Sequence, residues 1–294
     1  MTPARRKLEL TWGDISYLQW SPTHLSDPPT VLLLHGGGLD NAWLSWGAVG
    51  SALSDAGYRV IAPDHPGYGH SPPAPWPATQ ERLVGHVGDI VDALDLDRYV
   101  IGGLSLGGGM TIGHVLARPE KVAGAMLLGS YGLMDRQFTG PLALPAHVLT
   151  WVMLRTGMLR AVMHAYGKNR KRMASSIAGI IRDPAQRTPQ LLDEVMAEAG
   201  RGAGLEPFEQ WQRDQFGWNR LRTNYMSRLG EFPRPALVIH ADRDTGVRVE
   251  YAKTAAATIP DARLLIVPGA GHWVQRDRPQ PVTAAMLDFL NTTG

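Results

Sequence analysis

The chain has 294 residues with 29 Lys or Arg, 27 Asp or Glu and no Cys, which gives a formal net charge of +2. This length is enough for one large α/β domain with an insertion, or for two small domains. The absence of Cys excludes disulfides, a thiolate nucleophile and zinc-thiolate sites. The net charge is too small to indicate nucleic-acid binding, and no apolar run reaches the roughly 20 residues that cross a bilayer. We therefore expect a soluble, cytoplasmic protein, and the sequence leaves its oligomeric state open.

Short apolar runs and helical stretches alternate along the first 129 residues and again after residue 230. The expected elements are, in chain order, a strand at 30–34, a helix at 46–56, a strand at 59–62, a helix at 81–94, a strand at 99–101 and a helix from 110 to 116. The pattern resumes with strands at 236–239 and 263–267, which alternate with helices at 250–258 and 281–290. Such alternation predicts a parallel sheet built from strand-helix-strand units.

The middle of the chain has no comparable strand runs and is predicted to be helical. Thr188 and Pro189 are typical of a helix start, and we expect Gly200 to end that helix. Further helices are expected at 146–159 and 206–221. From residue 130 to 230 the chain holds 14 Lys or Arg against 8 Asp or Glu, so this third differs in charge from the rest. We predict a core domain of residues 1–129 and 230–294, with residues 130–229 as a helical lid.

A serine lies at a strand-to-helix corner in the run Gly103-Leu104-Ser105-Leu106-Gly107. In such a G-x-S-x-G turn the glycines allow a tight bend that strains the serine backbone and exposes its hydroxyl above the sheet. Because a helix begins at once, the amide of Leu106 is expected to point at a developing oxyanion. The pattern predicts that Ser105 is a nucleophile.

A serine hydroxyl needs a base, and the base needs an acid that orients it. His272 is the best base, because it lies in a glycine-rich segment just beyond the strand 263–267. Asp242 and Asp244 both follow the strand 236–239, and we favour Asp244 as the acid.

A second amide has to share the oxyanion with Leu106. The run His35-Gly36-Gly37-Gly38 follows the strand 30–34, and successive glycines let the backbone approach a substrate oxygen. We expect Gly37 to be the donor, with Gly38 as the alternative. His35 is expected to support this loop rather than to take part in catalysis.

With these residues assembled, the chain resembles the α/β-hydrolase superfamily over almost its whole length. The resemblance depends on the run 35–38, the segment 64–71, the turn around Ser105, the spaced acid and the pair Gly271-His272, with the order serine, acid, histidine. It implies an α/β-hydrolase fold: a mostly parallel eight-stranded sheet flanked by helices, with a lid inserted just after Leu128. It also selects Asp244 over Asp242, because the family places the acid three residues after a small residue, here Ala241.

The motifs at 35–38, 56–60 and 271–273 look like those of carbon-carbon bond hydrolases that split ring-cleavage products of aromatic compounds. That branch usually carries Asn before the nucleophile, where this chain has Leu104, and it uses a lid arginine to hold the acid group of the substrate. We therefore expect a serine hydrolase of a carboxylic ester with an apolar or aromatic part. The alternatives are carbon-carbon hydrolysis of a vinylogous diketo acid and a non-enzymatic ligand-binding protein or receptor on the same scaffold.

The remaining expectations concern the surroundings of this site. Trp273 and Leu104 are expected to contact a small-molecule substrate, and no metal, cofactor or nucleic acid is expected. Asp64 is expected to hold its own loop together through hydrogen bonds from backbone amides. The basic run from Lys168 to Arg172 is read as a solvated face of the lid, with an acidic substrate or an anionic surface as the alternative.

Overall fold

The computed structural model describes residues 1–22, 29–158, 161–162 and 169–293. Eight strands form one sheet in the order β1-β2-β4-β3-β5-β6-β7-β8. Their bounds are β1 (Ala4–Leu10), β2 (Gly13–Trp20), β3 (Thr30–Leu34), β4 (Val60–Pro63), β5 (Tyr99–Leu104), β6 (Val122–Leu128), β7 (Ala236–Ala241) and β8 (Ala262–Val267). Strand β2 is antiparallel to its neighbours β1 and β4, and the other pairings are parallel. The predicted mostly parallel, eight-stranded sheet is confirmed.

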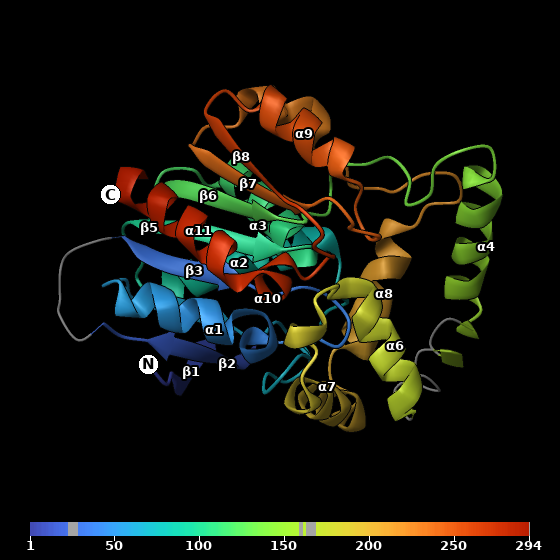
Figure 1. The fold of residues 1–294 in the computed structure, drawn as a ribbon, viewed down its shortest axis with the longest axis horizontal. Helices are drawn as coiled ribbons and strands as arrows, with labels where there is room; N and C mark the ends of the chain where they lie inside the picture. The colour runs from blue at the N-terminus through green and yellow to red at the C-terminus, as the bar shows by residue number, and fades with distance from the viewer. Residues whose placement is uncertain (23–28, 159–160, 163–168, 294) are drawn as a thin grey trace.

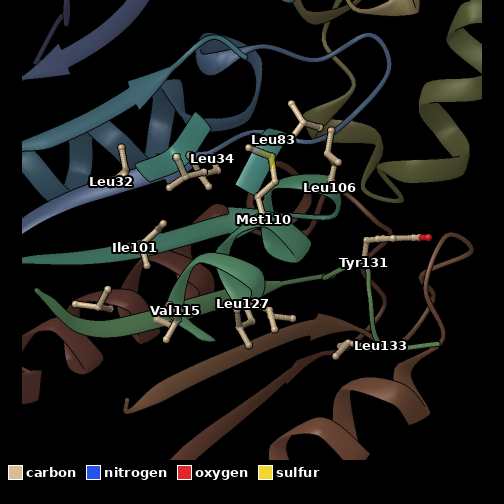
Figure 2. Close-up of a cluster of buried hydrophobic side chains, with 14 of the residues drawn as sticks. Leu32, Leu34, Leu83, Ile101, Leu106, Met110, Val115, Leu127, Tyr131 and Leu133 are labelled. Atoms are coloured by element: carbon tan, nitrogen blue, oxygen red, sulfur yellow. The ribbon is translucent and has the colours of Figure 1, made fainter. Parts of the chain in front are cut away.

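Helices pack on both faces of the sheet (Figure 1). One face carries α1 (Ala42–Asp55), α10 (Val274–Asp277) and α11 (Pro279–Thr293), and the other carries α2 (Gln80–Ala93), α3 (Leu106–Ala117) and α9 (Val249–Thr258). Because successive side chains of a strand point to opposite faces, Val31 and Leu33 belong to one buried cluster and Leu32 and Leu34 to the other. Figure 2 shows the second cluster, in which Met110 of α3 packs over the central strands.

The carboxyl ends of the central strands lie at one edge of the sheet. Leu34 of β3 pairs with Gly103 of β5, and Leu104 of β5 pairs with Leu128 of β6. The register continues past the strand ends, because the Ser105 amide donates to the carbonyl of Leu128 at 2.9 Å. In open α/β sheets the loops at this edge carry the ligand site. The segments that carry the predicted site residues therefore meet there.

Between β6 and β7 the described residues form α4 (Ala143–Arg155), α6 (Arg170–Ile180), α7 (Pro189–Arg201), α8 (Leu205–Gln215) and two short 3₁₀ turns. Helices α6, α7 and α8 lie beside the carboxyl edge of the sheet, whereas α4 stands at the periphery of the molecule (Figure 1). The structure confirms the start of α7, where the Thr188 side chain caps the helix and Pro189 is its first residue. The expected end at Gly200 is wrong, because the helix continues to Arg201 and Gly202 takes the left-handed conformation that ends it.

Other sequence-based expectations also differ from the structure at the level of elements. The helix expected at 206–221 is α8, and it already ends at Gln215. The N-terminal hairpin of β1 and β2 was not among the expected strands, because most of β1 is exposed and lacks a clear apolar alternation. The helix expected at 146–159 begins earlier, as α4, and ends at Arg155. Residue 159 itself lies outside the described residues.

Candidate active site

Ser105 forms the corner between β5 and α3. Its backbone has φ 52° and ψ −111°, a conformation with positive φ that few residues other than glycine adopt. A Cβ at Gly103 would overlap the carbonyl group of Gly107, and a Cβ at Gly107 would overlap the carbonyl oxygen of Leu34. The two glycines are therefore required by the close approach of helix and strands, as the sequence predicted. This strain turns the Ser105 side chain away from the sheet.

His272 and Asp244 form a hydrogen-bonded pair next to this corner. The Nδ1 atom of His272 lies 2.8 Å from Oδ2 of Asp244, although 28 residues separate them in the chain. The other carboxylate oxygen of Asp244 accepts hydrogen bonds from the amides of Gly246 at 2.7 Å and Val247 at 3.0 Å. With Nδ1 donating to the carboxylate, Nε2 of His272 is left without a proton and can act as a base.

Electrostatics favour this arrangement. Burial by itself raises the pKa of Asp244, but the neighbouring His272 and the hydrogen bonds to the carboxylate outweigh it and hold the pKa below its ordinary value. For His272, burial lowers the pKa, but the charge and hydrogen bond of Asp244 outweigh burial and raise it. The pair can therefore stabilise an imidazolium that forms during a reaction.

The structure distinguishes between the two aspartates that follow β7. Asp244 is fully buried beside His272, whereas Asp242 is exposed and accepts a hydrogen bond from the Gly269 amide at 2.6 Å. The placement of Asp244 agrees with its selection from the sequence. Asp242 instead holds the turn after β8.

Gly36, Gly37 and Gly38 line the same cavity as Ser105 and His272. Leu106 is the first residue of α3, so its amide has no acceptor within the helix. Gly37 lies directly against the ring of Phe208 from α8, because a Cβ added to Gly37 would overlap that ring. The structure thus brings both expected donor residues to the edge where Ser105 lies.

Asp40, which sequence reasoning missed, closes the loop that contains these glycines. Its carboxylate accepts hydrogen bonds from the amide of Gly36 at 2.7 Å, the amide of Asn41 at 2.8 Å and the hydroxyl of Ser45 at 2.7 Å. The side chain is buried, and burial raises the pKa of Asp40 despite these hydrogen bonds and the nearby His35. The only hint in the sequence is that Asp40 precedes Asn41, the N-cap of α1.

The two buried histidines below the loop have structural roles. His35 accepts a hydrogen bond from the His65 amide at Nε2, so its Nδ1 donates to the carbonyl of Gly36 at 2.7 Å. The two rings lie against each other with 3.8 Å between their centroids and their planes tilted by 35°. The supporting role expected for His35 agrees with this geometry. Asp64, as expected, accepts backbone hydrogen bonds, from Ala42 at 2.9 Å and from His70 at 3.0 Å.

The cavity above Ser105 has a volume of about 290 Å³ and an apolar lining. Leu104 and Trp273 line it, and their expected contact with a substrate stays a prediction. The sequence did not predict which lid residues contribute, and these are Met173, Ser176, Ile177, Ile180, Val195 and Phe208. Among the described lining residues none is a Lys, Arg, Asp or Glu. The cavity thus fits an uncharged apolar group.

The basic run of the lid lies outside this cavity. Arg170 forms an ion pair with Asp193 of α7, and Lys171 is exposed. Lys168 lies outside the described residues. Within the described part of the chain, no cluster of three His, Asp or Glu side chains has the geometry to hold a metal ion.

Glu198 on α7 is a second buried carboxylate that the sequence did not indicate. It is fully buried and accepts hydrogen bonds from Asn41 Nδ2 at 2.9 Å and from the Gly69 amide at 3.0 Å, and it pairs with Arg201. Glu198 therefore ties α7 to the loop after β3 and to the loop after β4. Arg201 lies three residues away on the same helix, but Asn41 and Gly69 are 157 and 129 residues away, so no local pattern could have revealed these two partners.

A strained serine at a strand-to-helix turn, beside a histidine-aspartate pair at the carboxyl edge of a parallel sheet, is typical of hydrolases that use a serine nucleophile. Residues 29–279 match the sequence model of the family described as alpha/beta hydrolase fold. The chain belongs to this family, and it is a hydrolase.

Curated relatives indicate a particular branch. A 2-hydroxy-6-oxononadienedioate/2-hydroxy-6-oxononatrienedioate hydrolase of Cupriavidus pinatubonensis is 30% identical over 268 residues, which cover 89% of this chain and 86% of the relative. A 2-hydroxy-6-oxo-6-phenylhexa-2,4-dienoate hydrolase of Burkholderia cepacia is 27% identical, and the matched region covers 91% of this chain and 90% of the relative. The structure of a meta-cleavage product hydrolase from Pseudomonas fluorescens has a TM-score of 0.79 at 22% identity, with 98% of each chain covered. These relatives agree better with the carbon-carbon alternative than with the ester expectation.

Proposed function

We propose that this hydrolase cleaves a carbon-carbon bond next to a ketone in a product of aromatic-ring cleavage. The observation that carries this proposal is the similarity over almost the whole chain to curated hydrolases of 2-hydroxy-6-oxo acids. The serine, histidine and aspartate beside one cavity supply the groups that such a hydrolysis requires.

In the proposed reaction Ser105 attacks the ketone carbon, and His272 accepts the hydroxyl proton. Asp244 orients the imidazole and stabilises its charged form. The amides of Gly37 and Leu106 hold the oxyanion, and each donor contributes about 3 kcal/mol to the stability of the transition state. The carbon-carbon bond then breaks, the leaving carbon takes up a proton, and water releases the acyl group from Ser105 with His272 as the base.

We also propose that residues 130–229 act as the lid of this site. Met173 and Ile177 of α6, Val195 of α7 and Phe208 of α8 line the cavity opposite the serine. A hydrophobic cover excludes water from the acyl intermediate until the leaving group has departed. The side chains of the lid would then set the substrate preference.

Ester hydrolysis is the second candidate, and the lining of the cavity favours it. Leu104 precedes the serine, and no described lining residue is a Lys or Arg that could form an ion pair with the carboxylate of a dienoic acid. A substrate with an acid group would have to direct that group out of the cavity, because burying an unpaired carboxylate is costly. A neutral ester with an apolar acyl part requires no such orientation.

The deciding experiment compares kcat/KM for a 2-hydroxy-6-oxo-6-phenyl dienoate with kcat/KM for nitrophenyl esters of short and medium chain length. We expect the dienoate to be the better substrate, and a clear preference for the esters would replace the first proposal by the second. The Ser105→Ala variant should lose a factor of about 10⁴ to 10⁶ in turnover of either substrate. Ser130→Ala is the matched control, because Ser130 is buried nearby but does not line the cavity. Near wild-type turnover by Ser105→Ala would exclude Ser105 as the nucleophile.

A further inference from the structure

Helix α4 is mostly apolar and yet largely exposed to water. Ten of its 13 residues are apolar (ALPAHVLTWVMLR), and only Ala143, His147 and Leu154 are buried. A helix that is apolar all round is normally enclosed by protein or by lipid. Figure 1 shows α4 at the outer edge of the molecule, away from the sheet. Among the described residues, none covers one side of this apolar helix.

The exposed side of α4 carries large aliphatic side chains. The exposed fractions are 72% for Leu142, 60% for Leu149 and 40% for Val152. At 100° per residue these three positions lie on one face, opposite the buried Ala143, His147 and Leu154. This row is a continuous apolar stripe, whereas single exposed apolar residues are common and need no explanation.

Two further apolar side chains are exposed on segments next to α4, although not on the face that carries the stripe. The Nε2 atom of His147 in α4 lies 3.0 Å from the carbonyl oxygen of Gly217, so the next residue, Trp218, lies near the helix. The Trp218 side chain is 64% exposed. Met158, just after α4, is 54% exposed. Tryptophan is enriched at water-lipid boundaries, because its ring is apolar and its NH is polar. We call Leu142, Leu149 and Val152 the α4 ridge, and Met158 and Trp218 are exposed apolar residues on the segments beside it.

The charge around the α4 ridge has a single sign in the sequence. Residues 136–182 contain eight Lys or Arg and no Asp or Glu. Of the described members, Arg136 and Arg155 are exposed and donate to the backbone carbonyls of Asn219 and Arg213, so they keep their full charge. Arg170 pairs with the carboxylate of Asp193. Apolar side chains beside exposed cations such as Arg136 and Arg155 are typical of segments that lie on anionic membranes.

A second copy of the chain is a poorer partner for this surface. In a symmetric dimer the same patch would face itself, so the cations of one copy would lie against those of the other. Among the helices in the described part of the chain, none is long and apolar enough to span a bilayer. We propose that the α4 ridge and its flanking arginines bind the surface of an anionic lipid bilayer, where apolar substrates accumulate.

The test is sedimentation of the purified full-length protein with vesicles of phosphatidylcholine alone or of phosphatidylcholine with one quarter phosphatidylglycerol. We expect binding to the anionic vesicles to be about tenfold or more stronger than to the neutral ones, and to fall when the salt is raised from 0.1 M to 0.5 M. The emission of Trp218 should shift to the blue on binding, and the Trp218→Phe variant should lose this part of the shift.

The variant Leu142→Ser/Leu149→Ser/Val152→Ser should lose about tenfold or more in vesicle binding. The control is Leu264→Ser on β8, an exposed leucine outside the ridge, which should bind as the wild type does. None of these residues lines the cavity, so turnover of a soluble substrate without vesicles should be unchanged and shows that the variants fold. Equal binding by the triple variant, or no wild-type binding to anionic vesicles, would overturn the proposal. A concentration-dependent dimer that the triple variant loses, without vesicle binding, would assign the ridge to a second copy.

Discussion

Replacing Glu198 by Ala tests whether the buried carboxylate on α7 attaches the lid to the core. The substitution removes two acceptors, and it leaves the Asn41 side chain and the Gly69 amide as buried donors without a partner. A hydrogen bond to a charged group contributes about 1.5–3 kcal/mol. Arg201 is half exposed and can be solvated, so its loss adds little. We expect Glu198→Ala to lower the free energy of unfolding by about 3–5 kcal/mol.

The conservative variant Glu198→Gln makes this expectation specific. The single side-chain oxygen of Gln can replace one of the two acceptors, but its amide NH₂ would face the other donor. We therefore expect a loss in the free energy of unfolding that is smaller than that of Glu198→Ala but not zero. Because Asn41 follows the glycine loop after β3, kcat should fall more than KM changes. Urea unfolding and steady-state kinetics measure both effects.

The matched control for both variants is Glu194→Ala, one turn earlier on α7. The Glu194 side chain accepts an exposed hydrogen bond from Gln190 and its charge acts on the buried Arg276, so we expect a loss of at most about 1 kcal/mol in the free energy of unfolding, well below that of Glu198→Ala. The attachment of α7 through the Glu198 carboxylate would be refuted if Glu198→Ala lowered the free energy of unfolding by less than about 1 kcal/mol. Equal losses for the Glu194 and Glu198 variants would refute it as well.

Two further predictions concern the core and the lid junction. His86 is buried between two tryptophans with both ring nitrogens unpaired, and burial lowers its pKa to about 3. The unfolded chain takes up a proton on this residue below pH 6.5 and the folded chain does not, so stability should fall by about 2 kcal/mol between pH 7 and pH 5. His86→Phe should remove this part of the pH dependence in urea unfolding, and an unchanged pH dependence would contradict the assignment. Gly204→Ala would place a Cβ on the Gly38 carbonyl, whereas Gly202→Ala has the same positive φ and open space. We expect backbone strain to lower the free energy of unfolding by about 1–2 kcal/mol in both variants. Gly204→Ala alone should lose further stability and also kcat. Equal effects in the two variants would exclude the close approach of residue 204 to the Gly38 carbonyl.

The catalytic candidates could be found from the sequence because each lies in a local motif at the end of a strand. The turn around Ser105 carries its own glycines, and the sequence around His272 marks the loop after β8. Once alternating elements predict a parallel sheet, these loops must meet at one edge. The same argument brought Asp242 and Asp244 to that edge but could not separate them by geometry, since both follow β7.

Contacts between distant segments were decided only by the tertiary structure. Glu198 lies 157 residues from Asn41, and the ring of Phe208 covers Gly37 across a similar distance in the chain. Whether a carboxylate is buried, or an aromatic ring lines a cavity, depends on which helix face turns inward, and helical periodicity leaves this undetermined in a lid whose helices are apolar on more than one side. The sequence by itself therefore determined five of the parallel strands and the residues at the carboxyl edge of the sheet, because these follow from short-range pattern, whereas the β1–β2 hairpin and β6 did not stand out. The lining of the cavity, the anchors of the lid and the uncovered side of α4 depend on how the helices pack, and only the folded chain decides that.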